Sequence, residues 1–157
     1  MKFFRAEHYQ ASCERLFRQY QPEIQKLLPN ARIEHVGASS IPMAVSKGDL
    51  DIFVGVEAIE LESAVQRLTT MGFQVKSDTF RSSVLCMLES TSNEDVALQI
   101  VAIGSEFECF LTFRDKLRSN PLLVRQYNKL KISCEGKSQE EYRRKKSAFI
   151  EHILEQT

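Results

Sequence analysis

The chain has 157 residues, of which 43% are hydrophobic and 27% are charged, as in ordinary soluble domains. Lysine plus arginine equals aspartate plus glutamate, at 21 each, so the net charge is zero. This balance argues against a general nucleic-acid binder, and the hydrophobic content argues against disorder. We expect a single domain over residues 1–157, helical from about residue 105.

The N-terminal part predicts a long helix followed by a strand. Apolar residues at three- and four-residue steps predict a helix over residues 7–28, which Pro22 could kink or divide in two. Residues 32–36 are a short strand candidate that runs directly into a turn of small residues, Gly37–Ser40. Small residues allow the backbone to turn sharply and to approach a ligand closely.

The next segment predicts a short helix and then the clearest strand of the chain. Pro42 suits the first turn of a helix over residues 42–47, with Gly48 as its stop. Over residues 49–56 the side chains alternate strictly between two faces. One face carries Leu50, Ile52, Val54 and Val56, and the other carries Asp49, Asp51 and Phe53.

The remaining elements follow from the same periodicities. They are a helix over 58–71, strands over 73–75, 80–88 and 96–103, a hairpin turn over 90–95, and three helices near 107–117, 121–130 and 138–154. We therefore predict an α/β (α+β) fold with a mixed sheet flanked by helices.

The cysteines and the N-terminus indicate where the protein is expected to reside. Cysteines 13, 86, 109 and 134 lie far apart in sequence, without the paired spacing of a zinc site or a disulfide scaffold. We interpret them as reduced, mostly buried thiols. The first ten residues do not resemble a signal peptide, and apolar runs are too short to span a membrane. A cytoplasmic protein without membrane contact is expected.

Two carboxylates and a turn of small residues are the candidate functional residues of the sequence. Asp49 and Asp51 stand two apart on a predicted strand, so both side chains project from one face and can hold Mg²⁺ or Mn²⁺. The Gly37–Ser40 turn precedes them, and backbone N–H groups at such a turn attract phosphate. A phosphate cradle beside paired carboxylates is suited to a nucleoside triphosphate with its metal. A solvated strand face or salt bridges are the alternative for the two aspartates.

Several segments resemble the GrpB-like family of the nucleotidyltransferase superfamily. They are His35–Pro42, Lys47–Ile52, Phe113–Arg118 with Pro121, Tyr127, Asn128 and Lys131, and Tyr142–Phe149. The resemblance covers nearly the whole chain. It implies a nucleotidyltransferase-like small mixed sheet flanked by helices, with a C-terminal helical segment.

The resemblance also implies roles for individual residues. Asp49 and Asp51 fall on the paired catalytic and metal-binding carboxylates. Gly37 and Ala38 fall on a glycine-serine pair, with alanine in place of serine, and Ser39 or Ser40 could supply the hydroxyl.

A third carboxylate, expected on the strand over 96–103, is absent, and the polar residue there is Gln99. Its amide oxygen can ligate a metal but supplies neither charge nor base. Glu94 or Asp95, just before that strand, is the alternative third acid.

Four cations are candidates for phosphate binding beside the turn, and each has a structural alternative. Lys47 precedes the acidic strand, and Lys131 lies on a predicted helix. Arg114 and Arg118 are four apart and so share a helix face, where they could clamp phosphates or form surface ion pairs, for instance with Asp115. The run Arg143-Arg144-Lys145-Lys146 is interpreted as a solvated face. His35 is interpreted as a structural histidine.

Three hypotheses for function follow. The first is a metal-dependent protein that binds a nucleoside triphosphate and transfers a nucleotidyl group to an unknown acceptor, by two-metal phosphoryl chemistry. The second is a nucleotide- or phosphometabolite-binding module with little or no turnover, which Gln99 favours. The third is an accessory module with a protein partner, because the resemblance implies that GrpB-like domains also occur joined to dephospho-coenzyme A kinase. Nucleic acid is not expected as a partner.

Overall fold

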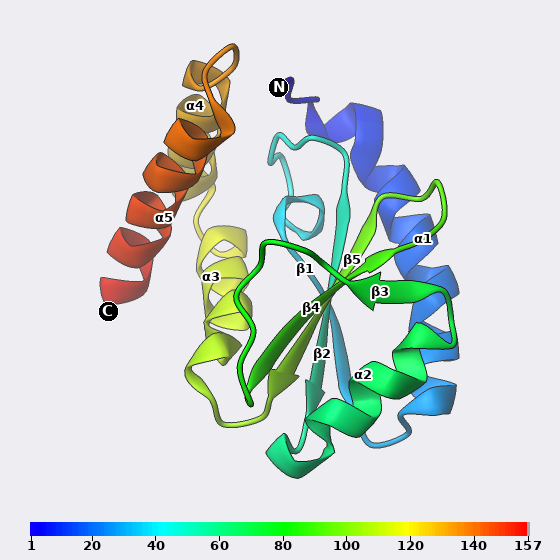
Figure 1. The fold of residues 1–157 in the computed structure, drawn as a ribbon. Coiled ribbons are helices and arrows are strands. Elements are labelled where there is room, and N and C mark those ends of the chain that lie inside the picture. Colours follow the sequence, from blue (N-terminus) through cyan, green and yellow to red (C-terminus); the bar gives the residue numbers. More distant parts are fainter. Residues whose placement is uncertain (157) are drawn as a thin grey trace.

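The computed structural model describes residues 1–156 and contains a five-stranded mixed sheet between two layers of helices (Figure 1). The strand order is β1-β2-β5-β4-β3, in which β2 and β5 run parallel and all other neighbours are antiparallel. The strands are β1 (Arg32–Val36), β2 (Leu50–Val56), β3 (Phe73–Val75), β4 (Leu85–Ser90) and β5 (Val96–Ala102). The α/β (α+β) prediction with a mixed sheet is confirmed.

The helices are divided between the two faces of the sheet (Figure 1). One face packs against α1 (Ala6–Leu27) and α2 (Leu61–Thr69), and the other packs against α3 (Cys109–Arg118). Two further helices, α4 (Pro121–Ser133) and α5 (Gln139–Glu155), form a hairpin beside α3. Short 3₁₀ turns lie at Ala38–Ser40, Ala58–Glu60 and Glu106–Glu108. From Glu106 to Glu155 the regular elements are all helical.

The alternation along β2 decides which side chains are available to a ligand. Its aliphatic positions enter the core formed with α1 and α2, while Phe53 packs on the opposite face against α3. Asp51 shares the parity of Phe53 and therefore faces the C-terminal helices. In register, Phe53 stands opposite Gln99 of β5 and Asp51 stands opposite Ala97. Asp51 and Gln99 consequently belong to the same face of two adjacent strands.

The predicted helix over residues 42–47 was wrong. Residues 42–47 contain no helix, because Ser46 instead exchanges two backbone hydrogen bonds with Phe4, with N···O distances of 2.7 and 3.1 Å. Met43 also adopts a φ of 70°, which a right-handed helix cannot accommodate. Pro22, by contrast, lies inside α1, which continues to Leu27 as one helix.

Polar caps fix where the C-terminal helices begin. Asn120 accepts a hydrogen bond from the backbone N–H of Leu122 at the start of α4, and Ser138 accepts one from Glu141 at the start of α5. Stacking of Tyr127 on Phe149, with ring centroids 5.1 Å apart, holds the two helices together. Among residues 1–156, none of the helices has the length and hydropathy needed to cross a bilayer.

Candidate functional site

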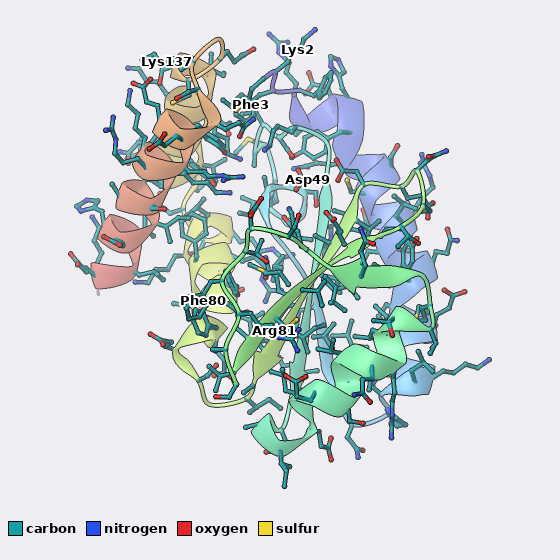
Figure 2. All side chains as sticks on the ribbon, in the orientation of Figure 1. Lys2, Phe3, Asp49, Phe80, Arg81 and Lys137 are labelled. Carbon is teal, nitrogen blue, oxygen red and sulfur yellow. The ribbon has the colours of Figure 1, made fainter. Side chains whose placement is uncertain are left out.

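A cavity of about 370 Å³ lies between the sheet and the C-terminal helices. Asp49, Asp51 and Gln99 line it from the sheet, Gly37 and Ala38 line it from the turn after β1, and α3, α4 and α5 supply the opposite wall. Figure 2 places Asp49 at the start of β2, between the sheet and the C-terminal helices. The structure thus brings both predicted carboxylates and the first half of the predicted turn to one cavity.

The turn and the second aspartate are in direct contact. Gly37 has a φ of 74° and a ψ of −178°, a conformation that is essentially restricted to glycine. A Cβ atom at this position would lie 2.3 Å from Oδ2 of Asp51 and 3.0 Å from its Cβ. The backbone of the turn therefore approaches the carboxylate more closely than any other residue type would permit.

Burial and a neighbouring carboxylate both act on Asp51. Burial, together with the nearby charge of Asp49, raises the pKa of Asp51 from 3.8 to about 7. Ser46 donates a hydrogen bond from Oγ to Oδ1 of Asp49 over 3.2 Å. Two carboxylates held this way would gain from a bound cation, which offsets both the burial and the repulsion.

Gln99 contributes an oxygen that has no partner within the protein. Its Oε1 atom is buried and accepts no hydrogen bond from residues 1–156, and the side chain lines the cavity. A buried acceptor without a donor costs free energy unless a ligand satisfies it. A metal ion or a donor group of a bound ligand would satisfy it here.

The alternative third acids lie elsewhere. Glu94 accepts a hydrogen bond from the Tyr20 hydroxyl, and neither Glu94 nor Asp95 lines the cavity. Burial and the charge of Asp49 nevertheless raise the pKa of Asp95, which precedes β5. The described part of the chain holds no cluster of three or more histidine, cysteine, aspartate or glutamate side chains suited to a metal.

Lys131 is a buried basic residue in the cavity wall. It is only 2% exposed, donates a hydrogen bond from Nζ to the carbonyl of Val45 over 2.8 Å, and lies 4.1 Å from the Tyr127 ring centroid. Burial, together with the nearby charge of Lys146, lowers its pKa from 10.5 to about 7. Lys131 thus lines the same cavity as Asp49 and Asp51.

Further cations line the same cavity, and sequence reasoning identified one of them. Lys47 was expected there, whereas Lys76, Arg143 and Lys146 were not. Arg143 and Lys146 are three residues apart on α5 and so share a face, a spacing that the sequence did contain. Nothing in the sequence marked Lys76, which follows β3 and reaches the cavity only through the order of strands in the sheet.

Arg114 and Arg118 do not line the cavity but support the turn from behind. Arg114 is buried and donates through Nη1 to a carboxylate oxygen of Glu34 over 2.9 Å and to the carbonyl of His35 over 3.0 Å. Arg118 donates through Nε to the carbonyl of Ser40 over 2.8 Å. The two arginines therefore fix the backbone on either side of Gly37.

Both serines of the turn are buried and are also engaged in holding it. The Ser40 hydroxyl donates to the carbonyl of Gly37 over 2.6 Å, and Ser39 Oγ lies 2.8 Å from Nε2 of His35. His35 stacks on Phe17, and burial lowers its pKa to about 4, so it is neutral near pH 7. Neither serine lines the cavity, which leaves the backbone of Gly37 and Ala38 as the part of the turn that faces a ligand.

Comparison with known proteins gives consistent matches over nearly the whole chain. A family model described as GrpB protein matches residues 5–156. A UPF0157 protein of Vibrio cholerae is 67% identical over 156 residues, covering 99% of this chain and 83% of that protein. A UPF0157 protein of Deinococcus radiodurans is 30% identical over 141 residues, covering 88% of this chain and 74% of that protein.

Solved structures share the fold. The conserved protein GrpB from Enterococcus faecalis superposes with a TM-score of 0.79 at 24% identity, covering 97% of this chain and 94% of that one. The structure of Cid1 in complex with its short product ApU superposes with a TM-score of 0.52 at 15% identity, over 77% of this chain and 38% of that one. At these identities the likeness concerns the fold, which is nucleotidyltransferase-like.

Proposed function

The chain belongs to the GrpB family, and we propose that its cavity binds a nucleoside triphosphate with Mg²⁺ or Mn²⁺ and transfers a nucleotidyl group to an acceptor. The observation that carries this proposal is the contact between the Gly37 backbone and the Asp51 carboxylate inside a cavity lined by cations. This arrangement supports the proposal, because the turn, the cations and the carboxylates line one cavity and could contact a single ligand.

The available donor atoms fit a hard divalent cation. Asp49 and Asp51 supply carboxylate oxygens, and Gln99 supplies a neutral amide oxygen that has no other partner among residues 1–156. Oxygen ligands of this kind suit Mg²⁺ and Mn²⁺. When bound, the ion would neutralise charge on the phosphates and on the aspartates.

The chain's own groups would position the triphosphate. The backbone of Gly37 and Ala38 would approach phosphate oxygens, and Lys131 would neutralise part of their charge. In the transfer reaction a hydroxyl oxygen of the acceptor bonds to the α-phosphorus and gives up its proton to solvent water, while the bond from the α-phosphorus to the bridging oxygen breaks and pyrophosphate leaves with that electron pair. The protein contributes mainly orientation and charge stabilisation to such a reaction.

Gln99 favours a second candidate function. An amide cannot act as a base toward the acceptor hydroxyl, and it does not add the negative charge that a second metal ion requires. The same cavity would then bind a metal–nucleotide or a phosphometabolite without turning it over. The two candidates differ in pyrophosphate release and share the binding step.

Thermal unfolding with ATP, GTP, CTP and UTP, each with and without Mg²⁺ or Mn²⁺, tests the binding step. A ligand at 100 times its Kd adds about 2.7 kcal/mol, or roughly 5–10 °C for a chain of this size. We expect such a shift for at least one nucleotide, only with metal, and its loss in Asp49→Asn/Asp51→Asn. The control Glu23→Gln/Glu60→Gln removes two exposed charges and should keep the shift.

Absence of a metal-dependent shift with every nucleotide would refute the binding proposal. Where a shift is found, release of pyrophosphate on adding candidate acceptors separates transfer from binding alone.

A further inference from the structure

We propose that α5 carries a second anion subsite in the same cavity, formed by Arg143 and Lys146 together with Lys47, and that it binds the phosphate of a small phosphomonoester acceptor. This inference rests on the proposed function, because it assigns the remaining part of that cavity to the partner of the nucleotide. The acceptor would carry both a phosphate group, for binding, and a hydroxyl group, for attack.

The first argument is the convergence of two ammonium groups on one buried ring. Nζ of Lys47, from the segment before β2, and Nζ of Lys146, from α5, each lie 5.8 Å from the ring centroid of Tyr142. Tyr142 is only 4% exposed and lines the cavity, so its ring links the segment before β2 to α5 within the cavity wall. A bound anion would reduce the repulsion among the like charges that line this wall.

The second argument is that the cations of the cavity lining have no carboxylate partner within the protein. Outside the lining, Lys145 pairs with Glu141 over 3.7 Å, whereas Arg144 takes part in no salt bridge with residues 1–156. Among residues 1–156, Lys47, Arg143 and Lys146 take part in no salt bridge, although all three line the cavity. The cations that face the cavity are thus left without a carboxylate from the protein.

The third argument is the charge and size of the cavity. Its lining includes five basic residues, Lys47, Lys76, Lys131, Arg143 and Lys146, against two acidic ones, Asp49 and Asp51. A metal–triphosphate complex on the sheet side would balance only part of this excess of positive charge. The volume of about 370 Å³ is at the small end of ligand pockets, so a molecule that shares it with a nucleotide must itself be small.

The location of the cations supports assigning them to the acceptor. Asp49, Asp51 and Gly37 lie on the sheet side, whereas Arg143 and Lys146 lie on the α5 wall. A phosphate held on α5 would bring the rest of the molecule across the cavity, toward the triphosphate. Fixing both reactants in this way contributes strongly to the rate of phosphoryl transfer, beside electrostatic stabilisation.

The test is a titration of the protein with glycerol 3-phosphate, with glycerol as the uncharged control probe. Both titrations are done with saturating Mg²⁺ and a non-hydrolysable nucleotide analogue. Binding is measured by calorimetry, and by ³¹P NMR for glycerol 3-phosphate. Arg143→Gln/Lys146→Gln is compared with Arg144→Gln/Lys145→Gln, which changes the same helix at positions outside the cavity lining. We expect at least a tenfold loss of glycerol 3-phosphate affinity in the first variant, none in the second, and less than a threefold change in nucleotide affinity in either.

Three results would overturn the proposal. Glycerol 3-phosphate binding no more tightly than glycerol would remove the subsite. An equal loss of nucleotide affinity in Arg143→Gln/Lys146→Gln would assign these cations to the triphosphate. If Arg143→Gln/Lys146→Gln lost binding to a short single-stranded RNA but kept its affinity for glycerol 3-phosphate, these cations would be assigned to a nucleic acid. If no nucleotide binds at all, the same titration without nucleotide still decides whether the α5 cations hold phosphate, independently of the proposed function.

Discussion

Replacement of Gly37 by alanine tests the contact on which the site depends. The residue has a φ of 74°, in a region where non-glycine residues cost about 1–3 kcal/mol. The added Cβ would also lie 2.3 Å from Oδ2 of Asp51, and overpacking of this kind costs about 1–3 kcal/mol. We therefore expect Gly37→Ala to lower the free energy of unfolding by about 2–6 kcal/mol, measured by urea denaturation.

Gly104→Ala is the matched control for the backbone part of this effect. Gly104 has a φ of 86°, and a Cβ there would meet no atom within 4 Å. The control should lose only the conformational part, about 1–3 kcal/mol. The difference between the two variants isolates the collision with Asp51.

A double-mutant cycle makes the reasoning refutable. In an Asp51→Ala background the carboxylate is gone, so Gly37→Ala should cost less by at least about 1 kcal/mol. Equal losses in both backgrounds, or a loss in Gly37→Ala no larger than in Gly104→Ala, would show that the turn does not press on the carboxylate as described.

Three further predictions concern charge and support of the turn. Because the pKa of Asp51 is raised from 3.8 to about 7, the folded chain binds this proton more tightly than the unfolded chain. Protonation of Asp51 therefore stabilises the folded state. This contribution to the free energy of unfolding is present below about pH 4 and is lost as the pH rises toward 7. Urea denaturation between pH 4 and 7 should show a shallower decline in Asp51→Asn, and an unchanged slope would contradict the assignment. Arg114→Met removes the donor to Oε1 of Glu34, which keeps its hydrogen bond from Arg32, and the donor to the His35 carbonyl. It should cost about 1–3 kcal/mol in the same assay, whereas a neutral effect would mean that the arginine does not hold the turn. Asn128→Ala removes the acceptor for the Val45 N–H and the donor to the Met43 carbonyl, so we expect faster amide exchange across residues 43–46, and unchanged exchange would argue against this support.

The periodicity of the chain was sufficient to predict the elements that hold the carboxylates. The alternation over residues 49–56 identified both the buried face of β2 and the face that carries Asp51. The starts of α4 and α5 could be predicted, because an N1 proline or a side-chain acceptor at a helix start leaves a local sequence signal. The sequence did not reveal that Ser46 pairs with Phe4, because that pairing is long-range and overrides the local preference of Pro42.

The candidate site was predictable only in part, for the same reason. Asp49, Asp51 and Gly37 lie close in sequence and were found together. The roles of Arg114 and Arg118 depend on how α3 packs behind β1, which spacing on a helix does not specify. Arg143 and Lys146 line the cavity, whereas the adjacent Arg144 and Lys145 do not. This difference depends on the rotation of α5 about its own axis, which the sequence does not specify.

The most direct test of the central claim is a crystal structure grown with Mn²⁺ and a non-hydrolysable nucleoside triphosphate. Anomalous scattering locates Mn²⁺ independently of the nucleotide. We predict one Mn²⁺ peak coordinated by Asp49 and Asp51, with triphosphate oxygens against the backbone of Gly37 and Ala38. A nucleotide bound away from this turn, or a cavity with neither Mn²⁺ nor nucleotide at saturating concentrations, would contradict the account.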